Sequence, residues 1–339
     1  MITFFRFIGI PEHLLAEVIT LAKSGLHSLG VNGSLLLSTE GVNGQFCIPI
    51  SLVSEFKTAL LNVNDRIFNG IDYNIGDTVE FPSSEVKFPF KKLMVKQKKE
   101  ILTTRFPDPS MKGKSLMTID DDDNQIEGEK NGGMVLNWND CGEEMPPEKW
   151  HSELHKKVDS SETADSPILI DCRNYYESDI GTFEGALPLN TTIFSDSWNA
   201  LENTLSDVPK DRKIMTFCTG GIRCVKVNAY LKQKMGYDNV ASLKKGIIAY
   251  EKWVSESERE AEDALTLDDT NITTDAVDSA VGTKVVVAVG SNAEGTSKDN
   301  TNDIRSSYFV GENFLFDRRR LADQYNEESL DPSYTPITD

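Results

Sequence analysis

Two of the five cysteines in this 339-residue chain flank a glycine-rich turn, and this turn gives the clearest indication of chemistry in the sequence. The segment KIMTFCTGGIRCVKVNAYL, residues 213–231, has an apolar strand pattern, two glycines and then a helical pattern. Backbone N–H groups at a helix N-terminus favour negative charge, and Arg223 would add a cation. Both effects lower the pKa of a thiol. We therefore predict a reactive thiolate at Cys218, in an anion-binding loop that comprises Thr219, Gly220, Gly221 and Ile222.

The two cysteines of this segment are expected to differ in role. Cys218 lies in the turn itself and is the better candidate for a nucleophile, with Arg223 holding an anionic species beside it. Cys224 falls in the first helical turn, where it would be shielded, although its spacing also allows it to act as a resolving partner. Free cysteines are often small buried residues with no other role. The C-x4-R spacing between a strand and a helix favours chemistry at Cys218.

The elements around this turn predict an α/β domain. SPILIDCRN, residues 166–174, has the continuous apolar run of a buried parallel strand. Strand and helix patterns then alternate, which indicates a doubly wound parallel sheet. Asp171 and Arg173 end the first strand and are expected to support the loop by an ion pair or hydrogen bond. Cys172, between them, is expected in the core, and Lys226 is expected to add positive charge beside the loop.

The N-terminal part of the chain has the predicted order β-α-β-β-α-β, which indicates a ferredoxin-like α+β domain. GVNG at 41–44 is predicted to be a hairpin turn, and KKLMVKQKKEILT at 91–103 the last strand. The predicted divisions are a ferredoxin-like domain over 1–105, a linker and leading helix over 106–160, the parallel-sheet domain over 161–255, an acidic, low-complexity and disordered insertion over 256–305, and a C-terminal segment over 306–339.

The net charge of −19 argues against broad attraction to nucleic acids or anionic membranes. Residues 87–114 are an exception, because they hold nine lysine and arginine residues against two acidic ones. Phosphate contact needs only local positive potential, since salt screens each charge within about 8 Å. An alternative is that these lysines are the solvated face of an edge strand. The candidate RNA contacts are Lys91, Lys92, Lys96, Lys98 and Lys99.

Cysteine usage and the apolar runs indicate a cytoplasmic protein. The five cysteines are scattered without a CxxC pair, which favours a reducing compartment. The N-terminus lacks the basic n-region of a signal peptide, and no apolar run approaches the roughly 18 residues that span a bilayer. His151 and His155 have the spacing of metal ligands but no evident third ligand, so no metal site is predicted. The oligomeric state is left open.

Several segments together resemble a known family. DCRNYYESDIGTFEGA followed by FCTGGIRC resembles the rhodanese superfamily, and more narrowly the rhodanese-type tRNA uridine(34) hydroxylases. Three further segments are similar to that family's segments in the N-terminal domain, between the domains and after the rhodanese domain: LLLSTEGVNGQF, FPFKKLMVKQKKEILT and GENFLFDRRRLAD. The motifs follow one another in the family's order.

The resemblance implies an acylphosphatase-like or ferredoxin-like module over 1–105 and a rhodanese domain over 161–255. It matches Cys218 with the family's active cysteine, which can carry a persulfide. The implied activity is oxygen-dependent 5-hydroxylation of the wobble uridine of tRNA, with tRNA as partner and molecular oxygen as co-substrate. No cofactor signature is evident. The span from Cys218 to Arg223 is that of rhodanese loops that handle sulfur and is one residue shorter than related phosphatase loops, which argues against a phosphatase.

Two other functions stay open from the sequence. One is a plain sulfurtransferase that passes sulfur through a persulfide of Cys218. The other is a noncatalytic RNA-binding scaffold, against which the intact loop counts. The chain also departs from the family pattern: Val225 stands where an acidic residue is usual, Lys245-Gly246 replaces a glycine pair, and no cysteine follows Cys224.

Overall fold

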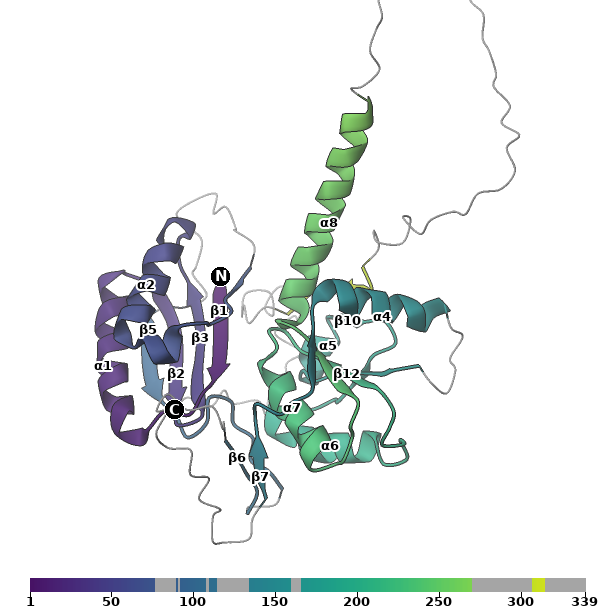
Figure 1. The fold of residues 1–339 in the computed structure, drawn as a ribbon, viewed down its shortest axis with the longest axis horizontal. Coiled ribbons are helices and arrows are strands. Elements are labelled where there is room, and N and C mark those ends of the chain that lie inside the picture. The colour runs from purple at the N-terminus through teal and green to yellow at the C-terminus, as the bar shows by residue number, and fades with distance from the viewer. Residues whose placement is uncertain are drawn as a thin grey trace, which may run out of the picture. The chain divides into compact units, whose positions relative to one another are not determined.

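The computed structural model of the protein describes residues 1–76, 90, 92–107, 110–114, 134–159, 166–269 and 307–314. Residues 1–252 and the segment that begins at Tyr308 form one compact unit, and residues 253–307 form a second. The first unit contains an N-terminal sheet and a parallel sheet, which Figure 1 shows with their helices. No helix in the described part of the chain is long and apolar enough to cross a membrane.

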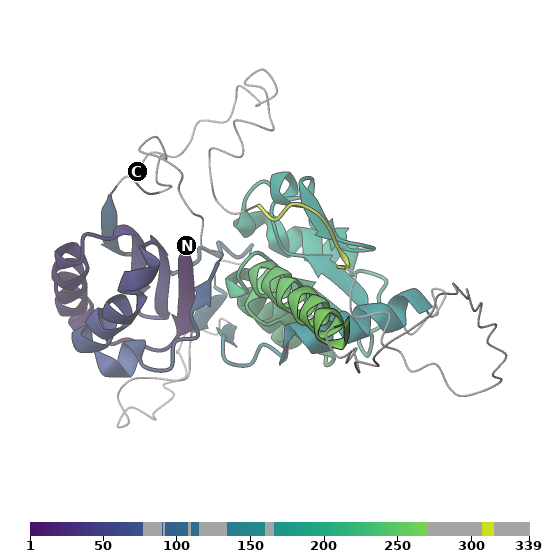
Figure 2. The same ribbon diagram turned by 90° about the horizontal axis from the view of Figure 1, so that it is seen from above.

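The N-terminal domain is a five-stranded sheet in the order β4-β1-β3-β2-β5. Helices α1 (Glu12–Ser28) and α2 (Val53–Val63) pack together and lie on one side of it (Figures 1 and 2). Their buried positions recur at helical spacing and meet a core of aliphatic and phenylalanine side chains. The strands are β1 (Ile2–Phe7), β2 (Asn32–Ser38), β3 (Gly41–Cys47), β4 (Asn74–Ile75) and β5 (Leu93–Gln97).

The predicted ferredoxin-like fold is confirmed, but its fourth strand is a different segment from the one predicted. The short strand β4 pairs with β1 in the place of that fourth strand, after the short helix α3 (Asp65–Phe68). The lysine-rich strand β5 is an additional strand, parallel to β2 at the opposite edge of the sheet. The two-residue length of β4 explains why no strand pattern was visible there.

The predicted turn at 41–44 is also wrong. β2 and β3 pair from Ser38 and Gly41 outward, so the turn is at residues 39–40 and GVNG lies inside β3. Gly44 is needed there because a Cβ at this position would lie 2.3 Å from the ring of Phe4 on β1. Asn43 is therefore a strand residue, paired with Phe5 of β1.

The second domain is a parallel sheet in the order β11-β9-β12-β13-β8, which confirms the predicted architecture. β12 lies at its centre and is buried at every position, as expected of a strand covered on both faces. The strands are β8 (Glu143–Met145), β9 (Ile168–Asp171), β11 (Leu187–Pro188), β12 (Ile214–Phe217) and β13 (Val240–Leu243), and the longer helices are α4 (Pro147–Asp159), α6 (Ser197–Thr204), α7 (Ile222–Gln233) and α8 (Gly246–Asp269).

Two small ladders complete the described structure. β6 (Lys112–Lys114) pairs with β7 (Val135–Asn137), and β10 (Gly181–Phe183) pairs with β14 (Phe309–Gly311) from the C-terminal segment. The acidic insertion was expected to begin at 256, whereas α8 continues as a helix to Asp269. The remainder of that insertion and the FDRRR motif at 316–320 lie outside the described residues.

Helix α7, which follows the cysteine turn, is buried on all sides. Residues 223 to 231 are all buried, including the charged side chains of Arg223 and Lys226. Charged side chains are almost never buried without a partner. The structure must therefore supply an acidic partner to each.

Candidate functional site

The cysteine turn connects the central strand to helix α7, as the sequence predicts. Cys218 follows β12, and Gly221 adopts a left-handed backbone conformation with φ of 96° just before α7. The N–H of Gly221 donates to Cys218 Sγ at 3.1 Å. The N–H groups of Thr219 and Gly220 donate to no acceptor in the described part of the chain, so two amides of the predicted anion-binding loop are available to a ligand.

The loop is packed tightly against the start of α8. Gly246 has a φ of 66°, and a Cβ there would lie 2.3 Å from the carbonyl oxygen of Cys218. The N–H groups of Ile247 and Ile248 donate to the carbonyl oxygens of Cys218 and Thr219. This contact and the positive φ explain why a glycine stands at position 246.

The predicted low thiol pKa of Cys218 is contradicted. Cys218 is fully buried, and burial raises its pKa well above the usual value, with the neighbouring Cys224 acting in the same direction. Arg223 lowers the pKa but does not overcome burial. The resting group is therefore a neutral thiol. The sequence shows the loop amides and the guanidinium, but it does not show how completely the core encloses the sulfur.

Arg223 is held by a residue whose role the sequence did not reveal. Glu177, on the short helix α5 (Tyr175–Ser178), accepts from both terminal nitrogens of Arg223, at 2.5 and 2.8 Å. Thr219 Oγ1 lies between them, 3.1 Å from Arg223 Nη2 and 3.3 Å from Glu177 Oε1. Burial alone would raise the pKa of Glu177, but attraction to Arg223 outweighs it and holds the pKa below its usual value. Glu177 is therefore the residue that braces the loop.

The expectation that Asp171 and Arg173 brace the loop is corrected accordingly. They form a buried bidentate pair with each other, at 2.9 and 2.6 Å, and neither bonds to residues 218–223 within the described structure. Arg173 also donates to the carbonyl oxygen of Gly181, and Ser178 and Thr182 donate to Asp171. The pair thus joins β9 to α5 and β10. It positions the segment that carries Glu177, and the charge of Asp171 also acts on Arg223 without a hydrogen bond.

Lys226 does not lie beside the anion-binding loop as expected. It is fully buried and forms an ion pair with Glu40, in the turn between β2 and β3, at 2.8 and 3.0 Å. Lys226 also donates to the carbonyl oxygen of Leu102 at 2.7 Å. Glu40 accepts in addition from the Ile101 N–H and from Trp138 Nε1. Burial raises the pKa of Glu40 and lowers that of Lys226, while their mutual attraction opposes both shifts. This pair connects the N-terminal sheet to α7.

A cavity of about 380 Å³ lies in front of the loop. This volume is within the range of about 300–1,000 Å³ that is usual for small-molecule sites. One wall comes from the loop of residues 218–223 and the start of α8. The other comes from β1, β3 and residues 70–74 of the N-terminal domain, so both domains contribute to its lining. Its lining includes Cys218, Thr219, Gly220 and Arg223 on one side and Thr3, Phe5, Asn43 and Gln45 on the other.

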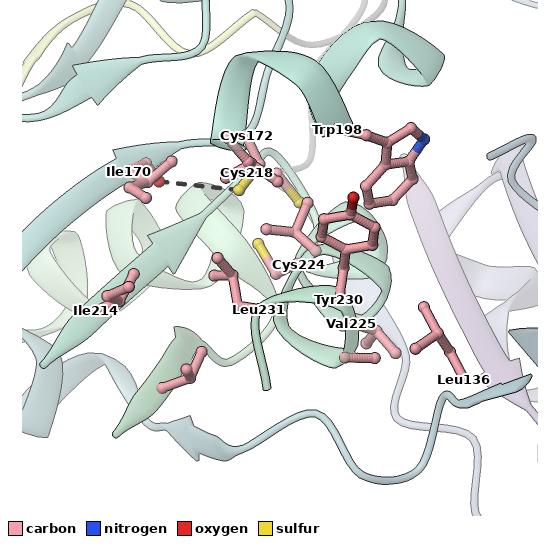
Figure 3. Close-up of a cluster of buried hydrophobic side chains, with 14 of the residues drawn as sticks. Leu136, Ile170, Cys172, Trp198, Ile214, Cys218, Cys224, Val225, Tyr230 and Leu231 are labelled. Atoms are coloured by element: carbon pink, nitrogen blue, oxygen red, sulfur yellow. Dashed lines mark hydrogen bonds between the residues drawn. The ribbon is translucent and has the colours of Figure 1, made fainter. Parts of the chain in front are cut away.

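Three cysteines gather behind this cavity. Cys172, Cys218 and Cys224 are all buried in one core cluster, and Figure 3 shows their side chains together. The thiol of Cys224 interacts with those of both neighbours, and burial raises its pKa. Cys172 is in the core as predicted. Cys224 is shielded as predicted, and its contact with Cys218 keeps the resolving role open.

The candidate RNA-binding lysines lie on the edge strand β5 and just beyond it. The four that the structure describes, Lys92, Lys96, Lys98 and Lys99, are exposed, and none forms an ion pair with another described residue. Lys91 lies outside the described residues. The two histidines with metal-ligand spacing instead contact tyrosines: His151 bonds to Tyr250 and His155 to Tyr308.

Sequence reasoning missed the cavity residues Asn43 and Gln45, and it missed Glu40, the partner of Lys226. Asn43 was attributed to a turn, and Glu40 lies 186 positions from Lys226. One signal could have found Glu40: Lys226 falls on the same buried helix as Cys224 and Arg223, and a buried lysine requires an acidic partner.

Comparison with known proteins assigns both domains. Residues 1–101 match the family model of the UPF0176 acylphosphatase like domain, and residues 151–255 match that of the rhodanese-like domain. A tRNA uridine(34) hydroxylase from Legionella pneumophila is 30% identical over 258 residues, which cover 76% of this chain and 82% of that protein. A tRNA uridine(34) hydroxylase from Rhizobium leguminosarum bv. trifolii is 32% identical over 262 residues, which cover 75% of this chain and 67% of that protein. The chain belongs to the tRNA uridine(34) hydroxylase family.

A third relative extends the match. The tRNA uridine(34) hydroxylase from Prochlorococcus marinus is 30% identical over 267 residues, which cover 76% of this chain and 70% of that protein. Each of these matches is longer than the rhodanese-like domain at residues 151–255, so the similarity extends beyond that domain. The resemblance inferred from the sequence motifs is confirmed.

Proposed function

We propose that this protein hydroxylates C5 of uridine 34 in tRNA, with Cys218 as the reactive group and molecular oxygen as co-substrate. The observation that carries the proposal is the cavity in front of Cys218, which is lined by residues of both the acylphosphatase-like and the rhodanese-like domain. A rhodanese loop alone would serve sulfur transfer. A cavity closed by a second domain provides room for a nucleotide-sized substrate beside the cysteine.

The neutral resting thiol fits a group that is activated when the cavity fills. The N–H groups of Thr219 and Gly220, which donate to no acceptor among the described residues, support an anion-binding position that a thiolate, a persulfide or an oxyanion on the substrate would occupy. Replacing C5–H by C5–OH with molecular oxygen consumes two electrons and two protons and releases one water. A reductant is therefore part of the proposed reaction.

The test uses tRNA from cells that lack the protein. Digestion and mass spectrometry quantify 5-hydroxyuridine and its derivatives, and the cells are complemented with wild type or Cys218→Ala. We expect loss of the modification and rescue by wild type alone. Unaltered tRNA in the deletion strain, together with sulfur transfer from thiosulfate in vitro, would favour the sulfurtransferase. Rescue by Cys218→Ala would refute the role of the thiol.

The basic strand β5 is proposed to contact tRNA phosphates. Neutralising Lys96, Lys98 and Lys99 together should weaken tRNA binding and reduce the slope of log Kd against log salt by about 2–3, since each phosphate contact contributes roughly 0.7–0.9. The matched control is Lys232→Met, which removes a lysine from α7 on the other domain. An unchanged affinity and slope in the triple variant would show that these lysines are only the solvated edge of the sheet.

A further inference from the structure

The cavity wall opposite Cys218 is one face of the N-terminal sheet. Thr3 and Phe5 of β1 alternate with side chains that enter the domain core, and they pair with Gln45 and Asn43 of β3. All four are half-buried and line the cavity. The face combines the ring of Phe5 with three side-chain amides, those of Asn43, Gln45 and Asn74 of β4, which is the character of a site for a flat polar ring. The Nδ2 of Asn74 donates to the carbonyl oxygen of Lys245 at 2.9 Å.

The amide of Asn43 has a fixed orientation. Its Nδ2 donates to the carbonyl oxygen of Ile101 at 3.2 Å, and a carbonyl can only accept, so the NH₂ group must point that way. Its Oδ1 accepts no hydrogen bond from any residue that the structure describes. Asn43 therefore presents a fixed acceptor to the cavity. The amide of Gln45, two positions along β3, has no hydrogen bond with a described residue and can rotate to donate or accept.

A fixed acceptor distinguishes the two pyrimidines. Uracil carries an N–H donor at N3 between two carbonyl oxygens, whereas cytosine carries an acceptor at N3. An acceptor facing the N3–H of uracil gains a hydrogen bond, while the same acceptor facing cytosine N3 leaves two buried acceptors opposed. A freely rotating amide would pair with either base. The Ile101 carbonyl removes that freedom from Asn43.

We propose that Asn43 is the specificity residue of the site, with its Oδ1 accepting the N3–H of a uracil base that has left its stack to enter the cavity. This inference rests on the proposed function. Gln45 pairs with a carbonyl oxygen of the same base. With the N3 edge held on the β3 wall, the C5 edge on the other side of the ring is directed toward the Cys218 wall. The N-terminal domain thereby reads the base, and the rhodanese loop acts on it.

The same sheet face continues to the basic edge. Asn43 pairs with Leu36 of β2, and Leu36 pairs with Lys96 of β5, so the three lie in one row across the sheet. Neighbouring strands are about 4.8 Å apart, which places β5 roughly 10 Å from β3. Phosphates that flank the bound base can reach Lys96 over that distance. We expect Lys96 to contribute affinity without base preference, in contrast to Asn43.

The experiment compares tRNA transcripts that differ only in U34 or C34. Their dissociation constants are measured for wild type and for Asn43→Ala, alongside 5-hydroxyuridine formation by wild type. We expect wild type to prefer U34 by about 10-fold or more, the value of one hydrogen bond in a desolvated site, and Asn43→Ala to bring the ratio near one. Because both RNAs are measured with the same variant, a loss of folded protein does not change the ratio of their dissociation constants.

Two further variants complete the test. Asn64→Ala removes the N-cap of α3, since Asn64 Oδ1 accepts a hydrogen bond from the Ile67 N–H at 3.1 Å. Neither residue lines the cavity. It should leave the U34 to C34 ratio unchanged. Lys96→Met should weaken the binding of both RNAs equally. If wild type forms 5-hydroxyuridine and the Asn43→Ala variant keeps the preference for U34, this inference is overturned and the proposed function stays intact. Wild type that forms none would refute the function itself.

Discussion

The buried pair of Lys226 and Glu40 connects the two domains that enclose the cavity, and replacing Lys226 by Met tests that connection. The substitution keeps the length and the apolar stem of the side chain but removes its charge. Glu40 then keeps its bonds from the Ile101 N–H and Trp138 Nε1, and it loses the cation at 2.8 Å. The carbonyl oxygen of Leu102 also loses its donor.

The magnitude follows from opposing effects of charge and burial. Two unit charges 2.8 Å apart attract by about 6 kcal/mol at an effective dielectric constant of 20. Desolvation of the two ions offsets most of this attraction, so the intact pair is close to neutral. Removing one partner leaves a buried charge unpaired, which costs about 3–5 kcal/mol. Because Glu40 keeps two hydrogen bonds, we expect Lys226→Met to lower the free energy of unfolding by about 3 kcal/mol, at the low end of this range.

The sign of the pH dependence follows from Glu40. Its pKa is already raised by burial, and losing Lys226 removes the main opposing interaction. A raised pKa in the folded state gives a contribution to stability that is present below the unfolded value of about 4.3 and is lost as pH rises through the folded value. The destabilisation by Lys226→Met should therefore be larger at pH 8 than at pH 5.

The assay is urea unfolding followed by tryptophan fluorescence, with the double variant Glu40→Gln/Lys226→Met to isolate the pair. The double variant should be less destabilised than the sum of the two single variants, because each single variant leaves one buried charge unpaired and the double variant leaves none. Lys232→Met, on the same helix but at the surface beside Asp140, should cost at most about 1 kcal/mol. Equal losses for Lys226→Met and Lys232→Met would refute the account of this pair.

Three further predictions concern the loop. Iodoacetamide should modify the half-buried Cys47 before Cys218, because burial raises the pKa of Cys218 and keeps it a neutral thiol; faster reaction at Cys218 in mapped peptides would contradict this. Glu177→Gln should destabilise the protein by about 3 kcal/mol at pH 7 in thermal unfolding and should lower activity, since Arg223 loses its buried partner. Because the pKa of Glu177 is lowered in the folded state, the difference in stability between wild type and this variant should shrink as pH falls below about 4.3. Gly246→Ala should reduce activity at least tenfold, since its Cβ would displace the Cys218 carbonyl, and full activity would refute that contact.

The loop could be predicted because the residues that form it are adjacent in the sequence. A strand, two glycines and a helix follow one another within residues 213–231, and backbone geometry places their N–H groups at one point. The parallel sheet was predictable for the same reason, since β9 and β12 are continuous apolar runs. The pKa of Cys218 was not predictable, because it depends on how many distant segments cover the sulfur.

The roles that sequence reasoning missed are those of residues whose partners are distant in the chain. Glu40 meets Lys226 across the domains, and Glu177 meets Arg223 from a four-residue helix that follows β9. Asn43 was attributed to a turn because Asn-Gly is a strong turn signal, whereas close packing of β1 on β3 is what requires the neighbouring Gly44. In each case a long-range contact overrides the local pattern.

The most direct test of the proposed activity is hydroxylation of purified tRNA under ¹⁸O₂. Unmodified tRNA is incubated with the purified protein and a thiol reductant, and nucleosides are analysed by mass spectrometry. We predict 5-hydroxyuridine at position 34 that carries one ¹⁸O atom with wild type, and none with Cys218→Ala. Oxygen derived from water, or equal product from Cys218→Ala, would contradict an oxygen-dependent hydroxylase that acts through Cys218.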